Sequence, residues 1–238
     1  SRYENKPFSY FDALMHETGH ALYEFGLPKK WKNQPLGRAG GMSLHESQSL
    51  FIEMQIVKSD EFVEYLSSIL NKKSYNISVD KEKLTKLNKS VFPNFIRVEA
   101  DELSYPLHII HRYNLEKKII NDSKIILNLP DVWNKEFDRL FNLNVKNDND
   151  GCLQDIHWYS GDFGYFPTYC IGAIIAAQIK YYLKKKHPIF FEEIKKGNFK
   201  SIIKWLRSNI HNKGSEFYID ELMKKITGEK LNTIPYQK

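Results

Sequence analysis

Two histidines stand four residues apart in the segment FDALMHETGHALYE, and a glutamate follows the first of them: His16, Glu17 and His20. Side chains four residues apart on an α-helix lie about 40° from each other around its axis, so both imidazoles can reach one metal ion from successive turns. Glu17 stands where it can accept a proton from a water molecule bound to that ion. The spacing therefore predicts a metal site that activates water for hydrolysis.

A catalytic zinc site needs a third protein ligand and one position left for water. Glu46, in the segment SLHESQSLFIE, is the candidate, and with His16 and His20 it would complete the site. Ser43 and Glu46 also form the S-x-x-E pattern of a capping box, in which the glutamate only stabilises the start of its own helix. We predict zinc at this site, with capping as the competing interpretation of Glu46.

Helices are expected to carry these residues, because most long segments repeat their apolar residues at intervals of three and four. The first helix is predicted from about residue 7 to 25, with Gly26 as its stop. Its apolar stripe should face the core, so that the two histidines face away from the core; the stripe consists of Phe11, Met15, Leu22 and Phe25. A second helix is expected from Ser43 to about Leu70.

The remaining helices are expected at residues 81–89, 93–121 with a kink at Pro106, 131–144, 167–186, 188–196, 198–210 and 215–227. The chain contains neither a repeat nor a flexible interdomain linker. The predicted fold class is therefore all-α, with one domain over residues 1–238.

The composition, with 42% hydrophobic and 27% charged residues, is that of a globular protein. The formal charge of +6 is spread over many segments, which argues against a nucleic-acid partner. The most apolar segment, CIGAIIAAQI, is shorter than the roughly 20 residues that cross a membrane. Cys152 and Cys170 form no CxxC pair, which favours a reducing compartment. We expect a cytoplasmic protein without membrane association.

Four segments, in this order and approximate spacing, resemble the motifs of the carboxypeptidase Taq family of metallopeptidases: HETGHALYE, HESQSLFIE, IRVEADELSYPLHI and GCLQDIHWYSGDFGYFPTY. The resemblance extends from the first residues to the C-terminal helices. It implies a zincin-like helical metallopeptidase, similar to the C-terminal half of the neurolysin and angiotensin-converting-enzyme cleft fold. It also implies removal of single C-terminal amino acids from peptide substrates in the cytoplasm, usually by a homodimer, with zinc or cobalt.

The same resemblance assigns roles to individual residues. His16, His20 and Glu46 become the metal ligands, and Glu17 becomes the general base. Arg97 corresponds to an arginine associated with the C-terminal carboxylate of the substrate, which a guanidinium can bind through two hydrogen bonds. A helix pair between Arg97 and Asp101, four residues on, is the structural alternative.

Further roles follow from the last of the four segments. His157 and Tyr169 correspond to positions that bind substrate and stabilise the oxyanion of the intermediate, with Tyr165 as a nearby alternative. Gln154 and Asp155 are expected to support the substrate site, for instance by orienting His157.

The chain departs from the family pattern because the family's DxRxT motif, expected shortly before HETGH, is absent. We therefore interpret the sequence as the C-terminal half of the pattern. A cleft without its other wall exposes apolar surface, so a companion N-terminal chain or reduced solubility is expected. Phe8, Tyr10, Phe51 and Phe95 are the candidates for that surface.

The leading interpretation is a zinc-dependent metallocarboxypeptidase that hydrolyses peptides with metal-activated water. Two alternatives stay open. One is a zinc endopeptidase, and the other is an inactive or partner-dependent half of a split enzyme.

Overall fold

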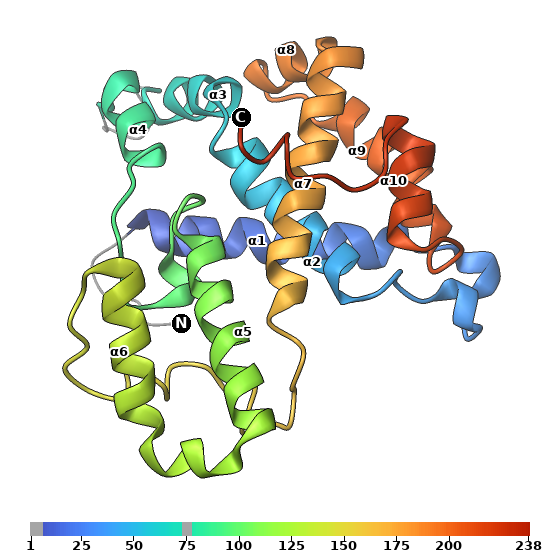
Figure 1. Ribbon diagram of the computed structural model, residues 1–238. Helices are drawn as coiled ribbons and strands as arrows, with labels where there is room; N and C mark the ends of the chain where they lie inside the picture. The colour runs from blue at the N-terminus through green and yellow to red at the C-terminus, as the bar shows by residue number, and fades with distance from the viewer. Residues whose placement is uncertain (1–6, 73–77) are drawn as a thin grey trace. The chain divides into compact units, whose positions relative to one another are not determined.

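The computed structural model describes the backbone of residues 7–72 and 78–238, and at the N-terminus the side chains from Tyr10 onward. Throughout these residues the regular structure is helical and no β-strand occurs (Figure 1). The prediction of an all-α fold is therefore confirmed. The chain divides into two compact units, one made of residues up to 89 together with 171–238, the other of residues 90–170.

The first unit contains the helices α1 (Pro7–Gly26), α2 (Met42–Leu50), α3 (Asp60–Leu70), α4 (Lys81–Asn88), α8 (Ile189–Lys195), α9 (Lys200–Asn209) and α10 (Ile219–Thr227), and most of α7 (Pro167–Lys186). A π-helical segment, η3 (Phe51–Val57), continues α2, and the short 3₁₀ turns are η1 (Lys29–Trp31), η2 (Pro35–Gly37) and η7 (His211–Lys213). Apolar side chains of α7 to α10 form much of the core, among them Ile175, Ile179, Phe191, Leu206 and Met223.

The buried face of α1 differs from the predicted one. Phe25 is 78% exposed, whereas Tyr23 is 0% exposed and Gly19 is buried. Met15 and Leu22, like the rest of the predicted stripe apart from Phe25, are only half buried. Because α1 packs with its histidine side against α2 and η3, the prediction that the histidines face away from the core was wrong. The prediction used only the large apolar side chains of α1, whereas α1 approaches the backbone of α2 closely at Gly19.

The predicted helix from Ser43 to Leu70 is interrupted. Residues 51–57 form the π-helical segment η3, and α3 starts only after Ser59. The Ser59 hydroxyl accepts a hydrogen bond from the N–H of Phe62 at 3.2 Å and so caps α3. Most side chains of α2 and η3 are buried, which makes this segment a central element of the first unit.

Only one of the described aromatic residues expected on an exposed apolar surface is itself exposed. Tyr10 is exposed, but Phe51 is 0% exposed because it starts the buried segment η3. Phe95 is half buried and packs against the core of the second unit. Both expectations were therefore wrong, and the side chain of Phe8 lies outside the described residues.

The second unit contains η5 (Arg97–Glu99), α5 (Tyr105–Asn121), η6 (Ser123–Asn128) and α6 (Leu129–Phe141). Its core is formed by side chains of α5, α6 and the following loop, namely Leu115, Trp133, Phe137, Phe141, Val145 and Cys152. The aromatic rings of Phe137 and Phe141 are stacked at 4.4 Å. These contacts hold the loop after residue 141 against both helices.

The predicted helix over residues 93–121 exists only from Tyr105 onward. Pro106 lies in the first turn of α5, where its missing N–H costs no hydrogen bond, so it begins the helix and does not kink it. Asp101 accepts hydrogen bonds from the N–H groups of Leu103 and Ser104, both at 2.9 Å, in the turn before the helix. The helix pair between Arg97 and Asp101 is therefore not formed.

Candidate metal centre

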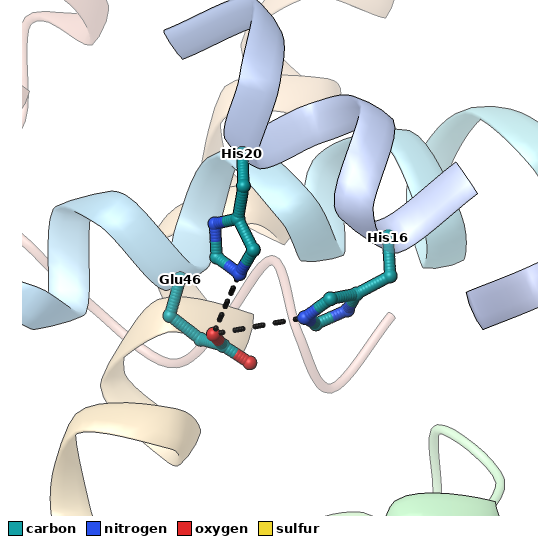
Figure 2. Close-up of side chains that lie close together, drawn as sticks. All are labelled: His16, His20 and Glu46. Atoms are coloured by element: carbon teal, nitrogen blue, oxygen red, sulfur yellow. Dashed lines mark ion pairs between the residues drawn. The ribbon is translucent and has the colours of Figure 1, made fainter. Parts of the chain in front are cut away.

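The two histidines of α1 and Glu46 of α2 point toward one another (Figure 2). Nε2 of His20 lies 3.5 Å from Oε2 of Glu46, and Nε2 of His16 lies 3.9 Å from the same oxygen. One ligand atom from each residue lies within 4.8 Å of the others. The structure thus brings together the three residues that the sequence predicts as metal ligands.

These separations suit a small divalent cation. In a tetrahedral zinc site with ligand bonds of about 2.1 Å, two ligand atoms are about 3.4 Å apart. The 3.5 Å and 3.9 Å separations from Glu46 lie close to that value. Two imidazoles and one carboxylate are also a donor set that catalytic zinc sites use.

The protonation state of His20 also favours metal binding. Burial, together with the neighbouring His16 and His45, lowers the pKa of His20 to about 4, so the ring is neutral near pH 7. Burial also acts to lower the pKa of His16, but a hydrogen bond to Glu53 and nearby carboxylates outweigh burial and raise it. A neutral imidazole offers the lone pair that a metal needs.

Glu53 contacts the metal centre from η3 and was not predicted. Its Oε2 lies 2.8 Å from Nδ1 of His16. A proton on Nδ1 that is donated to this carboxylate leaves the lone pair on Nε2, the nitrogen that faces Glu46. The sequence contains a signal for this contact, because residues seven apart in a helix lie on nearly the same face and Glu53 follows Glu46 by seven.

Glu46 does not cap its own helix. The N-cap of α2 is Gly41, with φ of 93°, and no side chain makes a capping hydrogen bond there. The helix begins at Met42, so Ser43 already lies inside its first turn and cannot act as the cap. The capping interpretation was therefore wrong, and the buried carboxylate of Glu46 faces the histidines.

Glu17 and His45 lie beside the three candidate ligands. The side chain of Glu17 is exposed, and its negative charge is close enough to help raise the pKa of His16. Nε2 of His45 lies 2.9 Å from Oε1 of Glu24, and its ring lies 4.5 Å from that of His20. His45 is thus half buried, pairs with Glu24 and packs against the ring of His20.

The second unit holds a buried ion cluster of two arginines on one carboxylate. Nε and Nη2 of Arg97 lie 3.0 Å and 2.9 Å from Oδ1 of Asp155, and Nε of Arg112 lies 2.6 Å from Oδ2. Burial raises the pKa of Asp155, but the two guanidinium groups outweigh burial and lower it. Two cations on one anion leave this cluster with an excess of positive charge.

Arg112 is the member of this cluster that the sequence analysis missed. It is fully buried in α5, between the apolar Ile109 and Leu115 of the same helix. Its spacing of three residues from both Ile109 and Leu115 is the signal that could have found it, although this face also carries buried polar residues, because a buried charge needs a partner. The partner, Asp155, lies 43 residues further along the chain, so the pair itself was not visible in the sequence.

Gln154 ties the same cluster to the backbone. Its Oε1 accepts from the N–H of Arg97 at 2.9 Å and from Nη2 of Arg112 at 2.6 Å. Its Nε2 donates to the carbonyls of Phe95 at 3.0 Å and Asp150 at 2.9 Å. The geometry gives Gln154 the position of a support for Arg97.

His157, Tyr165 and Tyr169 lie together in the same unit. Nε2 of His157 lies 2.8 Å from the hydroxyl of Tyr169, and the ring of Tyr165 lies 5.3 Å from that of His157. The Arg97 guanidinium lies over the ring of Tyr169 at 4.5 Å. Nδ1 of His157 is 3.9 Å from Asp155, too far for a hydrogen bond, so Asp155 contacts the arginines more closely than it contacts His157.

The predicted site residues therefore form two groups, each within one unit. His16, His20 and Glu46, with Glu17 beside them, belong to the first unit. Arg97, Gln154, Asp155, His157, Tyr165 and Tyr169 belong to the second.

Comparison with known proteins gives a consistent result. A family model described as carboxypeptidase Taq (M32) metallopeptidase matches residues 1–238. The chain is 40% identical to thermostable carboxypeptidase 1 of Pyrococcus furiosus over 223 residues, and this alignment covers 92% of this chain and 44% of that protein. It is 38% identical over 237 residues to carboxypeptidase 1 of Bacillus subtilis, which covers 98% of this chain and 47% of that protein.

Solved structures show the same likeness. A structure of Pyrococcus furiosus carboxypeptidase is similar with a TM-score of 0.89 and 38% identity, over 99% of this chain and 48% of that one. Trypanosoma cruzi metallocarboxypeptidase 1 is similar with a TM-score of 0.86 and 36% identity, over 95% of this chain and 48% of that one. The chain spans about half the length of the relatives that it matches.

Proposed function

Because the chain belongs to the carboxypeptidase Taq (M32) family of metallopeptidases, we propose that it provides the metal-binding part of a carboxypeptidase that releases C-terminal amino acids from peptides. The observation that supports this best is the convergence of His16, His20 and Glu46. These three residues would hold a divalent cation, with zinc as the first candidate and cobalt as the second. When bound, such a cation lowers the pKa of a water molecule and polarises the carbonyl that is attacked.

The residues around the ligands have separate tasks in this proposal. Glu17 accepts a proton from the attacking water and returns it to the departing amine. Its exposed position on α1, next to a ligand, leaves its carboxylate open to water. Glu53 holds the His16 ring in the tautomer whose Nε2 is free to bind a metal.

Residues of the second unit are proposed to bind the substrate. Arg97 would bind the C-terminal carboxylate, and the positive charge that Arg97 and Arg112 share over Asp155 supports this role. Tyr169 would donate a hydrogen bond to the oxyanion, with Tyr165 as the alternative donor. His157, 2.8 Å from the Tyr169 hydroxyl, would hold that hydroxyl in place.

Hydrolysis of an N-blocked dipeptide tests the proposal. The zinc-loaded chain should release the C-terminal amino acid, alone or together with the other half of the family pattern. No release by either preparation, despite bound zinc, rejects the proposal. An amidated dipeptide separates the alternatives, because an endopeptidase should cleave it nearly as well, whereas an enzyme that anchors a carboxylate on Arg97 should not.

A partner is proposed because the relatives have a further stretch of about equal length. We propose that such a stretch, in the same polypeptide or in a separate one, covers the outer face of α1. Tyr10, Leu14, Ala21 and Phe25 lie within about 60° around the α1 axis, and all four are exposed. Exposed apolar side chains that gather along one side of a helix are typical of an interaction surface, and here Glu17 lies at the edge of that side.

Substitution on this face tests the partner. The chain is co-expressed with the part of Bacillus subtilis carboxypeptidase 1 that it does not match. The wild type should co-elute with that part, and Leu14→Glu and Phe25→Glu should not. Ile189→Glu, at an exposed position of α8, is the matched control and should still co-elute. Co-elution of all variants would contradict the assignment of this face.

The location and the symmetric assembly are also proposals. Both cysteines are free, in agreement with a reducing compartment such as the cytoplasm. Within the described residues, no helix is both long and apolar enough to span a membrane. A homodimer is proposed from the family pattern, and sedimentation of the purified chain measures it.

A further inference from the structure

Two glycines contact the helix that carries Glu46, and they belong to two different helices. Gly19 is part of α1 and Gly172 is part of α7. We propose that both are positioning residues of the metal centre, because they allow α1 and α7 to approach α2 so closely that Glu46 stays within reach of the two histidines. This inference rests on the proposed metal site and adds the residues that set its dimensions.

Gly19 lies against the backbone of α2. A Cβ atom at this position would stand 2.4 Å from the carbonyl oxygen of Gln48 and 2.5 Å from Cα of Ser49. Carbon atoms in contact are normally about 3.5–4.0 Å apart, so a methyl group would push the two helices apart by about 1 Å. Backbone atoms cannot rotate away as a side chain can. Gly19 therefore sets the distance between the helix of the histidines and the helix of the glutamate.

Gly172 lies against the Glu46 side chain itself. A Cβ atom at this position would stand 3.1 Å from both Cβ and Cγ of Glu46 and 3.2 Å from the carbonyl oxygen of Ser43. These distances are a few tenths of an ångström shorter than an ordinary contact. A methyl group at 172 would therefore displace Glu46 slightly, and a larger side chain would displace it further.

Small residues of α2 complete this close packing. Ser47 and Ser49 are 0% exposed, and their hydroxyls donate to carbonyls of their own helix, Leu44 at 2.7 Å and Glu46 at 2.6 Å. These side chains thus occupy little space and need no partner outside α2. At the far end of the helix, Oε1 of Gln48 lies 3.0 Å from Nε2 of the buried His211. The helix consequently has little room to retreat from either glycine.

A metal site is sensitive to such displacements. Ligand bonds in zinc sites keep their lengths within about 0.2 Å, so ligands moved by about 1 Å cannot all bind one ion. The 3.5 Å between His20 and Glu46 spans α1 and α2, and Gly19 lies one residue before His20 at the contact of these helices. The packing of one glycine is in this way linked to the affinity for a metal.

Cobalt binding to the whole chain tests the inference. Co²⁺ affinity and the visible absorption of the bound ion are measured for the wild type, Gly19→Ala, Gly172→Ala and Gly172→Val. We expect about 100-fold weaker binding for Gly19→Ala and about 10-fold for Gly172→Ala, with a larger loss for Gly172→Val and an altered cobalt spectrum in each case. Wild-type affinity and spectrum in Gly19→Ala would overturn the inference.

A third glycine supplies the control for a loss of packing alone. Gly197, in the turn between α8 and α9, has φ of 74°, and a Cβ there would stand 2.3 Å from the Tyr65 ring. Gly197→Ala should lower the unfolding temperature and leave the cobalt affinity of the folded protein unchanged. A comparable loss of affinity in this variant would show that the metal responds to general destabilisation, and the inference would be wrong.

Crystal structures of the metal-free wild type and Gly19→Ala separate this inference from the proposed function. The Gly19→Ala structure should show α1 and α2 further apart by about 1 Å, and more than 3.5 Å between His20 and Glu46. If the wild type binds no cobalt, the proposed metal site fails, and these structures still decide whether Gly19 sets the helix distance. Unchanged helix positions would reject the inference. If Gly19→Ala does not fold, the graded effect of the two Gly172 variants provides the test.

Discussion

Nδ1 of His16 lies 2.8 Å from the carboxylate of Glu53, so one side of this imidazole faces an acceptor while the other faces Glu46. The contact connects α1 to the π-helical segment η3. It lets Glu53, which is not one of the three candidate ligands, influence which nitrogen of His16 carries the lone pair.

Replacement of Glu53 should weaken metal binding. Glu53→Ala removes the acceptor for Nδ1, so either tautomer of His16 becomes available, and the affinity for Zn²⁺ should fall by about 10- to 100-fold. Glu53→Gln keeps an acceptor oxygen and should lose less. Competition with a chromophoric chelator measures both, and Glu82→Gln on the exposed helix α4 is the control. Unchanged affinity in Glu53→Ala would contradict this role.

Replacement of Glu46 separates a ligand from a helix cap. Because α2 is capped at Gly41 without any side chain, Glu46→Gln should bind Zn²⁺ at least about 100-fold more weakly and keep its helical circular dichroism. Metal content and the far-ultraviolet spectrum are measured on the same preparation. A loss of helicity with retained zinc would point to a structural role for Glu46.

The metal-free protein should lose stability in mild acid. Burial and, to a lesser extent, nearby arginines lower the pKa of His108 and His111 to about 3 and that of His211 to about 4. Below pH 6.5 the unfolded chain therefore binds protons that the folded chain does not. The contribution of each histidine to the free energy of unfolding is fully present above pH 6.5. As the pH falls from 6.5 toward the folded pKa, that contribution decreases by about 1.4 kcal/mol per pH unit.

Urea unfolding at several pH values tests this pH dependence. His211→Gln should be less stable than the wild type at pH 7, because the partner of Gln48 is changed. Between pH 6.5 and about 4, its free energy of unfolding should fall less steeply with pH than that of the wild type. The difference in slope should correspond to about one bound proton, or about 1.4 kcal/mol per pH unit. An unchanged slope would mean that His211 is protonated in the folded protein.

Arg97 should affect recognition of the substrate's chain end. Arg97→Gln removes the guanidinium but leaves Arg112 to neutralise Asp155. We expect kcat/KM for a dipeptide with a free C-terminus to fall by about 100-fold, and activity on the amidated dipeptide to change little. Arg139→Gln, at an exposed position of α6, is the control. An equal fall on both substrates would argue for a structural role of Arg97.

Removal of Arg112 should destabilise the second unit. Its side chain is fully buried and binds Asp155, so Arg112→Met leaves that carboxylate with Arg97 alone, in a site built for two cations. Breaking a buried ion pair costs about 3–5 kcal/mol, which denaturant unfolding resolves easily. The double variant Arg112→Met/Asp155→Leu should lose less stability than the sum of the losses of the two single variants, because both remove the same pairing, and strictly additive losses would contradict a direct pairing.

Local patterns predicted most of the helices and the candidate metal-binding residues, but not the features that depend on distant contacts. The bounds of α1 and the placement of His16 beside His20 follow from spacing within a single helix. The buried side of α1 was wrongly predicted, since it depends on how closely Gly19 lets α2 approach. The break at Ser59 was also missed, although Ser59 followed by Asp60 and Glu61 is a pattern typical of a helix start, because the apolar residues on both sides favoured one continuous helix.

The same distinction applies to the second unit. Arg97 and Asp155 could each be named from a motif, but their pairing with Arg112 joins residues far apart in sequence. Periodicity extended α5 backward over residues 93–104, where Asp101 stabilises a turn. Side-chain acceptors that compete with the helix are therefore the main reason for the errors in element bounds.

The π-helical segment Phe51–Val57 has a consequence for insertions and deletions. A π-helix carries more residues per turn than an α-helix, so loss of one residue would let this segment tighten into ordinary α-helix. Seven π-helical residues turn through nearly the same angle as six α-helical ones, so the elements after the segment would keep roughly their orientation relative to Glu46. A single-codon deletion within Phe51–Val57 should thus be better tolerated than one within α2, where every later residue would rotate by about 100°.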